Sequence, residues 1–331
     1  MFGLYIHIPY CRSKCRYCDF YSTPCPDGVP EAYIDALCRE MDRFSPCGST
    51  PLRPDTLYFG GGTPSLLTPA QAARLIRAAG PVPGAEITLE ANPETVTPER
   101  LAAFRRAGVN RLSLGIQTAR DDSLARLGRR HTAAQSRRAL GMAVQAGFTD
   151  ISGDLMLALP AYTMAELDET TALLAESGCT HISGYLLKIE PNTVFGKRPP
   201  EALPGDDAAA DFYLAAVEKL ALRGRRRSGR FAIRSRFTEK GEFWKSVDLV
   251  IMKFQTLPAP ALKAATTGSI GTAAIILALA PRRTAAWAAS ALPRRRARPR
   301  SLPRPRWTNP RANAPPEITS CSSSVFPAGF H

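Results

Sequence analysis

Short apolar runs alternate with longer amphipathic stretches through the first two thirds of the chain. The short runs predict strands, because a few consecutive apolar and β-branched residues between turn signals are typical of a buried parallel sheet. The predicted strands span Gly3–Ile8, Thr56–Phe59, Glu86–Glu90, Arg111–Gly115, Asp150–Leu155 and His181–Leu186. The predicted helices between them span Glu31–Phe44, Pro69–Ala79, Pro98–Ala107, Ala133–Ala146 and Met164–Glu176. This alternation predicts parallel βα units.

Local signals agree with these helix boundaries. Thr68 and Thr97 each precede a proline at the first helical position, and both patterns are typical of helix starts. Gly108, Gly147 and Gly178 follow the ends of three helices, where a left-handed residue is common. Six βα units predict an α/β fold, a partial (βα)6 barrel over residues 1–222, with its chemistry at the carboxyl ends of the strands.

Three cysteines follow the first predicted strand at the spacing C-x3-C-x2-C: Cys11, Cys15 and Cys18. Three thiolates can hold three irons of a [4Fe-4S] cluster and leave the fourth iron open to another ligand. A structural zinc site would take four ligands, and no fourth Cys or His stands at finger spacing. The spacing therefore favours an iron-sulfur cluster.

Further polar or flexible residues follow the next strands. Gly61, Gly62 and Thr63 come after the second strand, where backbone without side chains lets a ligand approach closely. No lysine follows the last glycine, so this is not a phosphate-binding P-loop. Glu90 and Gln117 end the third and fourth strands. A carboxylate and an amide at neighbouring strand ends can bind the ribose hydroxyls and the methionine part of S-adenosylmethionine (SAM).

The run from Tyr5 to Cys11, with Cys15, Cys18 and Phe20, resembles the radical SAM family that contains oxygen-independent coproporphyrinogen III oxidases and haem chaperones. The resemblance covers residues 1 to about 222. The oxidases have a further cysteine two residues after the third ligand; Phe20 stands there, as in the chaperone branch. By resemblance, the SAM contacts are Tyr5, Gly61, Gly62, Thr63, Glu90, Gln117, Arg130 and Asp154. Ala158 and Ala161 depart from the family, which commonly has glycines there.

The resemblance implies a haem chaperone with a [4Fe-4S] cluster and SAM as cofactors and haem as cargo. Its partners would be haem-accepting proteins and an electron donor such as flavodoxin or ferredoxin. Two alternatives remain: a coproporphyrinogen III oxidase, whose radical would take hydrogen from propionate side chains, and an inactive truncated remnant. In either case cleavage of SAM would start from an electron supplied by the cluster.

Charge divides the chain at about residue 222. Residues 1–222 carry 22 Lys and Arg against 25 Asp and Glu, whereas residues 223–331 carry 21 against 4. Uniform basicity would favour a nucleic-acid partner, but the predicted barrel is mildly acidic, so no specific nucleic-acid partner is predicted. No apolar run is long enough to cross a bilayer and no signal peptide is recognised, so we expect a cytoplasmic protein without a transmembrane segment.

The basic tail has an unusual relation to the genetic code. One shifted frame permits YEISNFARPGFESRHNWKYW from Ile251 to Gly271, and DYIGFGPAAHS from Ala274 to Ala285. Both peptides resemble the segment that follows the sixth unit in haem chaperones, including a motif HNxxYW that is implicated in haem binding. We therefore expect residues 223–331 to be a frameshifted, low-complexity and largely disordered tail that replaces the family's C-terminal domain.

Overall fold

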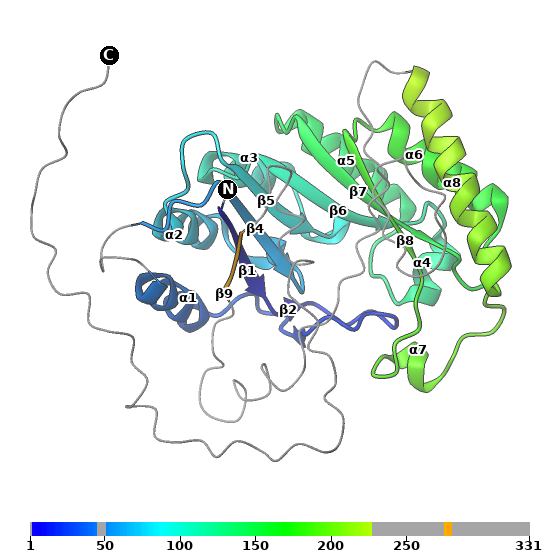
Figure 1. Ribbon diagram of the computed structural model, residues 1–331, viewed down its shortest axis with the longest axis horizontal. Helices are drawn as coiled ribbons and strands as arrows, with labels where there is room; N and C mark the ends of the chain where they lie inside the picture. The colour runs from blue at the N-terminus through cyan, green and yellow to red at the C-terminus, as the bar shows by residue number, and fades with distance from the viewer. Residues whose placement is uncertain (1, 45–50, 227–274, 280–331) are drawn as a thin grey trace, which may run out of the picture. The chain divides into compact units, whose positions relative to one another are not determined.

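Six parallel strands form the centre of this computed structural model, which describes residues 2–44, 51–226 and 275–279 (Figure 1). The strands are β1 (Phe2–Ile8), β4 (Thr56–Gly61), β5 (Glu86–Ala91), β6 (Arg111–Gln117), β7 (Asp150–Leu157) and β8 (His181–Leu186). Each strand pairs with the next one along the chain, in the order β8-β7-β6-β5-β4-β1. This is the open (βα)6 barrel, and it confirms the predicted α/β fold class.

Helices wrap around the outside of the curved sheet (Figure 1). The long ones are α1 (Glu31–Phe44), α2 (Pro69–Ala79), α3 (Pro98–Ala107), α5 (Ala133–Gln145), α6 (Met164–Glu176) and α8 (Asp206–Arg226). The predicted caps are present: the Thr68 hydroxyl accepts from the Gln71 amide and begins α2, while Gly108 ends α3 in the left-handed conformation. These caps satisfy amides and carbonyls that have no partner inside a helix.

The core lies between the sheet and this outer layer of helices. Phe59 of β4, Leu89 of β5 and Phe104 of α3 are fully buried there. Each such side chain stabilises the fold by about 1.5–3 kcal/mol through its removal from water. The strands are buried on both faces, which explains why they appear in the sequence as continuous apolar runs.

Short elements lie in the loops at the carboxyl ends of the strands. They are β2 (Tyr10–Cys11), β3 (Thr23–Pro24), η1 (Pro64–Leu66), η2 (Pro93–Thr95), α4 (Asp121–Leu127) and α7 (Val194–Lys197). The Gly62 amide donates to the Ile8 carbonyl, and the Thr63 amide donates to the Tyr10 carbonyl, both at 2.8 Å. These bonds continue the pairing of β1 with β4 beyond the strands. They hold the glycine run (Gly60–Gly62) against the start of the cysteine loop (Cys11–Cys18).

Two features differ from the expectation for the tail. Helix α8 continues to Arg226, past the predicted domain boundary at residue 222. Strand β9 (Ile275–Leu279) pairs antiparallel with the outer edge of β1, within the tail that was expected to be largely disordered. Its apolar, β-branched sequence suits an edge that offers free backbone groups. The rest of the predicted tail, residues 227–274 and 280–331, lies outside the described residues, and the domain boundary stays a prediction.

Candidate functional site

A cavity of about 550 Å³ lies at the carboxyl ends of the strands. We call it the main cavity. It is lined by nine of the predicted site residues: Cys11, Cys15, Cys18, Gly61, Gly62, Thr63, Glu90, Gln117 and Asp154. The cysteines, the start of the loop after β4 and residues of β5, β6 and β7 thus meet at one place, which is where barrels of this kind carry their chemistry.

The cysteine loop follows β2 and forms one wall of the main cavity. Cys11, Cys15 and Cys18 are all free thiols. Burial raises the pKa of Cys11, and it raises the pKa of Cys18 to about 11. Such thiols stay protonated near neutral pH unless a cation binds them, and coordination to a metal removes the proton.

A chain of hydrogen bonds connects the first two cysteines through two other loops. The Thr63 hydroxyl donates to Cys11 Sγ at 3.4 Å, and Asn92 Nδ2 donates to the Thr63 hydroxyl at 3.1 Å. Arg129 Nη1 donates to Asn92 Oδ1 at 2.9 Å and lies 3.9 Å from Cys15 Sγ. The loops after β4 and β5 and the turn after α4 therefore fix the cysteine loop, and Arg129 places a positive charge beside Cys15.

The glycine run packs so closely that side chains would not fit. Gly61 has φ +116°, and a Cβ there would lie 2.5 Å from the His7 ring. A Cβ on Gly62 would lie 2.6 Å from the carbonyl oxygen of Tyr10. Glycine is therefore required for the contact between the loop after β4 and the strand β1, as well as for the approach of a ligand.

Two half-buried carboxylates face the main cavity, Glu90 from β5 and Asp154 from β7. Glu90 accepts from the Tyr58 hydroxyl at 2.7 Å and from the Gly61 amide at 3.2 Å. Asp154 accepts from the Ser113 hydroxyl at 3.2 Å. Burial raises the pKa of Glu90, and burial together with the nearby Glu90 raises the pKa of Asp154 to about 7. Within the described residues neither carboxylate has an ion-pair partner, so hydroxyl groups or a positive charge on a ligand would satisfy both.

Gln117 stands at the end of β6 in a strained conformation. The pairing of β6 with β7 becomes irregular between Leu114 and Gln117. Gln117 has φ +69°, a left-handed conformation that costs a residue with a side chain on the order of 1–3 kcal/mol. Its Oε1 atom is buried and has no hydrogen-bond partner among the described residues. Strain and an unsatisfied buried amide in the wall of a cavity together indicate a ligand-binding position.

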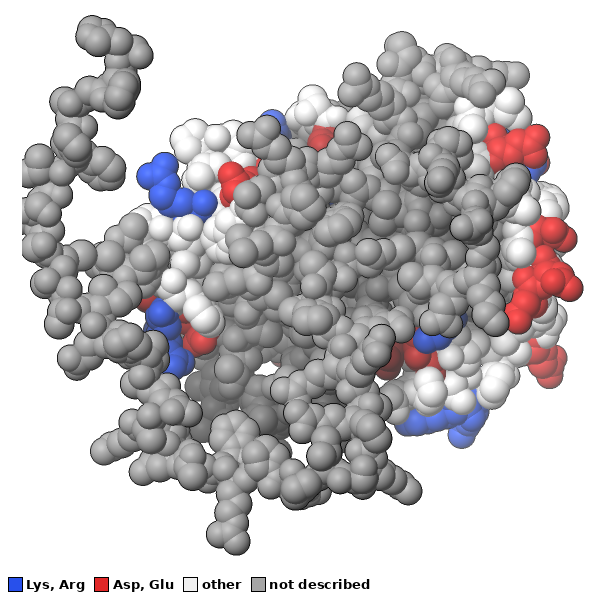
Figure 2. Space-filling view, in the orientation of Figure 1, with Lys and Arg blue, Asp and Glu red and all other residues white. Residues whose placement is uncertain are grey.

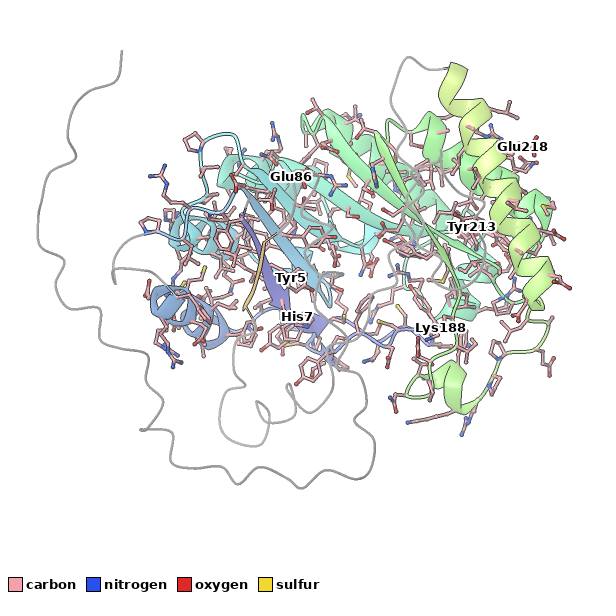
Figure 3. All side chains as sticks on the ribbon, viewed as in Figure 1. Tyr5, His7, Glu86, Lys188, Tyr213 and Glu218 are labelled. Carbon is pink, nitrogen blue, oxygen red and sulfur yellow. The ribbon has the colours of Figure 1, made fainter. Side chains whose placement is uncertain are left out.

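Two of the predicted SAM contacts do not line the main cavity. Tyr5 stacks on Tyr58, with ring centroids 5.9 Å apart, and its hydroxyl bonds to His7 Nδ1 at 3.1 Å. Figure 3 shows Tyr5 and His7 together along β1. Arg130 is exposed, because Gly128 ends α4 in the left-handed conformation and the turn that follows directs Arg129 inward instead. Arg129, which the sequence analysis missed, lines the main cavity.

The arrangement of the thiols suits a cluster better than a single ion. Within residues 2–44, 51–226 and 275–279, no three side chains of His, Cys, Asp or Glu are grouped closely enough for one metal ion. A four-iron cluster places each thiolate on a different iron, so its ligands stand farther apart. Three free cysteines on one wall of a cavity, with a neighbouring arginine, therefore fit a cluster with one open iron.

The sequence model of the radical SAM superfamily matches residues 5–174. The match covers about half of the chain and includes the cysteine loop, the glycine run and the strand ends described above. The chain belongs to the radical SAM superfamily, whose members bind SAM and a [4Fe-4S] cluster. None of the helices described in the structure combines the length and the apolar character that a bilayer crossing needs.

Within this superfamily the chain is similar to the haem chaperone HemW of Escherichia coli K12, with 41% identity over 227 residues. Identity to HemW of Haemophilus influenzae is 40% over 231 residues. Each alignment covers 67% of this chain and 60% of the relative, so the chain spans less than two thirds of their length. Among solved structures, coproporphyrinogen III oxidase (HemN) of Escherichia coli is similar, with a TM-score of 0.59 and 26% identity. That alignment covers 66% of this chain and 52% of HemN.

Proposed function

We propose that the barrel is the cofactor-binding half of a haem chaperone of the HemW type. Cys11, Cys15 and Cys18 would hold the [4Fe-4S] cluster, and Arg129 would stand beside it. The observation that carries the proposal is the wall of the main cavity, where three free thiols face the unsatisfied amide of Gln117 and two half-buried carboxylates. The similarity to HemW extends over the same residues.

SAM would lie between the cysteine loop and the strand ends. Its amino group fits beside the glycine run, and its ribose hydroxyls can donate to Glu90 and Asp154, which have acceptor capacity left. Gln117 offers an unused amide oxygen to the same ligand. When bound, the cluster supplies the electron that breaks the sulfonium bond of SAM and yields a 5′-deoxyadenosyl radical.

A larger apolar ligand is expected beyond SAM, on the side of β8. Met156, Leu186 and Leu187 line that side of the main cavity, with Lys188 close by. Figure 3 shows Lys188 beyond the end of β8. Apolar side chains beside a cation suit a flat apolar ring that carries carboxylates, such as haem. Haem would then be the cargo, and haem-accepting proteins its destination.

Dehydrogenation of coproporphyrinogen III is the second candidate function. The structural similarity to HemN supports it. Phe20 argues against it, because Phe20 lines the main cavity at the position where the oxidases have a further cysteine. A partly buried phenyl ring can neither ligate a metal nor donate a hydrogen atom as a thiol does. We therefore favour the chaperone.

We further propose that the coding sequence is frameshifted after about residue 224. The two peptides permitted in the shifted frame support this. If so, the chain does not contain the HNxxYW motif, which appears only in the shifted frame. The third candidate, an inactive remnant, would then mean that haem transfer is lost while SAM binding and cleavage are kept. Sequencing of the DNA across these codons tests the proposal directly: an intact open frame would contradict it.

An iron-sulfur protein of this kind also suits a reducing compartment, the cytoplasm.

The function is tested with two full chains, the printed one and one with the frame restored. Both are loaded anaerobically with iron and sulfide, and SAM affinity, SAM cleavage under dithionite, haem binding and coproporphyrinogen turnover are measured. We expect both chains to bind and cleave SAM, and the restored chain to bind haem without turnover. Turnover of coproporphyrinogen would establish the oxidase instead, and failure of both chains to bind SAM would refute the proposal.

A matched pair of variants ties the result to the main cavity. Gln117→Ala removes the unsatisfied amide and is expected to weaken SAM binding about tenfold, which corresponds to the loss of one buried hydrogen bond. Gln145→Ala changes an exposed glutamine near the end of α5 and is expected to leave SAM affinity unchanged. Equal affinities of the two variants would exclude Gln117 as a SAM contact.

A further inference from the structure

We propose that the outer face of the cysteine loop is a docking surface for a small acidic protein that carries single electrons. The proposal rests on the proposed function, because reductive cleavage of SAM requires an electron for the cluster. It goes further by assigning the place of entry and the charge of the donor. Flavin-containing and iron-sulfur carriers share this chemistry, and the experiment below uses one of each.

The cysteine loop is thin at Cys15. On its outer side lies a second, very small pocket of about 10 Å³, which we call the outer pocket. Cys15 lines both the outer pocket and the main cavity. The outer pocket is also lined by Arg12, Arg129 and Arg130. The two pockets also share Ser13, Thr63, Asn92 and Arg129, so a cluster bound to Cys15 would lie one layer of side chains from the outer pocket. Three cations and one carboxylate, Glu94, line that pocket.

The sequence of the cysteine loop places cations on its outer side. Arg12 and Arg16 are exposed and do not line the main cavity, whereas the neighbouring Cys11 and Cys15 are buried and half-buried and do line it. The Arg12 guanidinium donates to the Glu94 carbonyl at 3.1 Å, and the Arg16 guanidinium lies 3.5 Å from the Arg126 carbonyl. Neither contact neutralises a charge. Both arginines therefore remain available to an anionic partner.

A second basic segment adjoins the loop. The Phe195 amide of α7 donates to the Arg16 carbonyl at 2.9 Å, which ties α7 to the cysteine loop. Lys197 and Arg198, at the end of α7, are exposed. In Figure 2 blue side chains lie at the lower right of the view, over the place of α7 in Figure 1. The docking surface thus comprises the outer faces of the cysteine loop, the turn at Arg130 and α7.

No carboxylate in the described part of the chain neutralises these cations. Within the described residues, Arg12, Arg16, Arg130, Lys197 and Arg198 form no ion pair. The neighbouring Arg126, by contrast, pairs with Asp122 at 3.2 Å. Like charges that lie close together repel one another, and a partner of opposite charge would relieve this repulsion on binding.

An apolar side chain lies among the charges. Val194, the first residue of α7, is 52% exposed, although its neighbour Phe195 is buried. A small apolar contact inside a charged rim is typical of transient complexes, which need fast association and fast release. Single-electron carriers form complexes of this kind. The surface therefore suits such a carrier better than a permanent subunit.

The test compares two variants of the full chain that carry the same charge change. The first, R12E/R16E/R198E, reverses the docking surface without altering the cysteines, Arg129 or the predicted SAM contact Arg130. The control, R77E/R137E/R138E, reverses three exposed arginines on α2 and α5. The basic tail is the same in both variants, so an attraction to the tail affects them equally. Affinities for an acidic flavodoxin and for an acidic ferredoxin are measured anaerobically at two salt concentrations.

We expect the docking-surface variant to bind at least one of the two carriers about tenfold more weakly than the unchanged chain at low salt, and less so at high salt. The control should bind within about twofold of the unchanged chain. Equal affinities of the two variants would overturn the proposal. It would also be overturned if neither carrier binds while a short DNA duplex binds and loses affinity in the first variant alone, because the surface would then serve nucleic acid.

Dithionite separates this proposal from the proposed function. A small inorganic reductant needs no docking surface, so the first variant should cleave SAM with dithionite at the rate of the unchanged chain. Failure of the unchanged chain to cleave SAM with dithionite would refute the proposed function. The docking proposal is decided separately, by the measured affinities of the two variants for flavodoxin and ferredoxin.

Discussion

The two ends of the same sheet treat buried charge in opposite ways. At the amino ends, Arg111 donates to Asp150 at 3.3 Å and lies 3.9 Å from Glu86, so three charges satisfy one another. At the carboxyl ends, the half-buried carboxylates of Glu90 and Asp154 have no cation as partner within the described residues. Figure 3 labels Glu86 near one end of the sheet and Lys188 near the other.

The difference shows what each end contributes. The ion pairs around the buried Arg111 need nothing from outside, and removal of one partner would destabilise the fold. Carboxylates without a cation and a strained glutamine with an unsatisfied amide oxygen destabilise the fold until a ligand satisfies them. Residues that stabilise the fold thus lie at the amino ends of the strands, and residues that could bind a ligand lie at the carboxyl ends. Substitutions at one end should therefore affect mainly the property of that end.

The largest effect is expected at the carboxyl end, on metal content. Cys15→Ser should abolish binding of the roughly four irons expected per chain, because an alcohol is a poor ligand for iron. The free energy of unfolding of the metal-free chain should stay nearly unchanged. Iron and sulfide analysis after anaerobic loading measures the effect. Cys25→Ser is the matched control, since Cys25 lies beside Cys11 in the structure and should not affect iron. Full iron content in Cys15→Ser would contradict the cluster assignment.

The next effect is expected at the amino end, on stability. Arg111→Met leaves Glu86 and Asp150 without their cation, and it should lower the free energy of unfolding by about 2–3 kcal/mol, less than for a fully buried pair because both carboxylates are partly exposed. Urea unfolding measures it. Iron content of the folded variant should be normal. Arg137→Met, at an exposed position on α5, serves as the control, and an equal loss in both would remove the contrast between the two ends.

Asp154→Asn should increase stability at alkaline pH. The pKa of Asp154 is about 7 in the fold against 3.8 for an ordinary aspartate, so its ionised form is disfavoured by folding. The wild-type chain therefore loses stability as the pH rises from about 4 to 7, by an amount on the order of 2 kcal/mol, and the variant does not. Urea unfolding of the metal-free chain between pH 4 and pH 8 measures the difference.

The matched control for that series lies on the surface. Asp168 pairs with Lys219, which lowers the pKa of Asp168, so Asp168→Asn should change the pH dependence slightly and in the opposite direction. A stabilisation by Asp154→Asn that is the same at pH 4 and pH 8 would show that its cause is not ionisation.

The smallest effect is expected in the loop after β7. Ala158 and Ala161 both have φ +55°, a left-handed conformation that strains a residue with a Cβ. Replacement of both by glycine should raise the free energy of unfolding by about 0.5–1 kcal/mol, since the strain relieved exceeds the added freedom of the unfolded chain. Ala102→Gly, within α3, should lower it by a similar amount. Thermal unfolding distinguishes the two directions, and destabilisation by the double variant would refute the argument from strain.

The periodic features of the fold were predictable from the sequence. All six strands and five of the helices stand where the apolar patterns and the caps predict them. Helix α8 was missed because its alanine-rich sequence has no proline or threonine at its start and runs into the arginine-rich tail. Strand β9 was missed because edge pairing depends on a free strand far away in the sequence.

The candidate site was predictable by residue type and less so by geometry. Cys11, Cys15 and Cys18 stood out by their spacing, and the structure brings them to one wall of the main cavity; their role as cluster ligands stays a prediction. The choice between Arg129 and Arg130 depended on how Gly128 ends α4, which the two adjacent arginines do not reveal. Neither the inward position of Arg129 nor the left-handed conformation of Gln117 has a signature in the sequence, because both arise from contacts between distant loops.

The position of Cys15 between the main cavity and the outer pocket has a consequence for how such proteins diversify. Because one side of the loop faces the main cavity and the other side meets solvent, substitutions on the two sides act on separate properties. Surface charges can change to accept another reductant in a new host, while the shape of the cavity and its choice of ligand stay the same. A laboratory redesign could use this separation to pair the barrel with an artificial electron source.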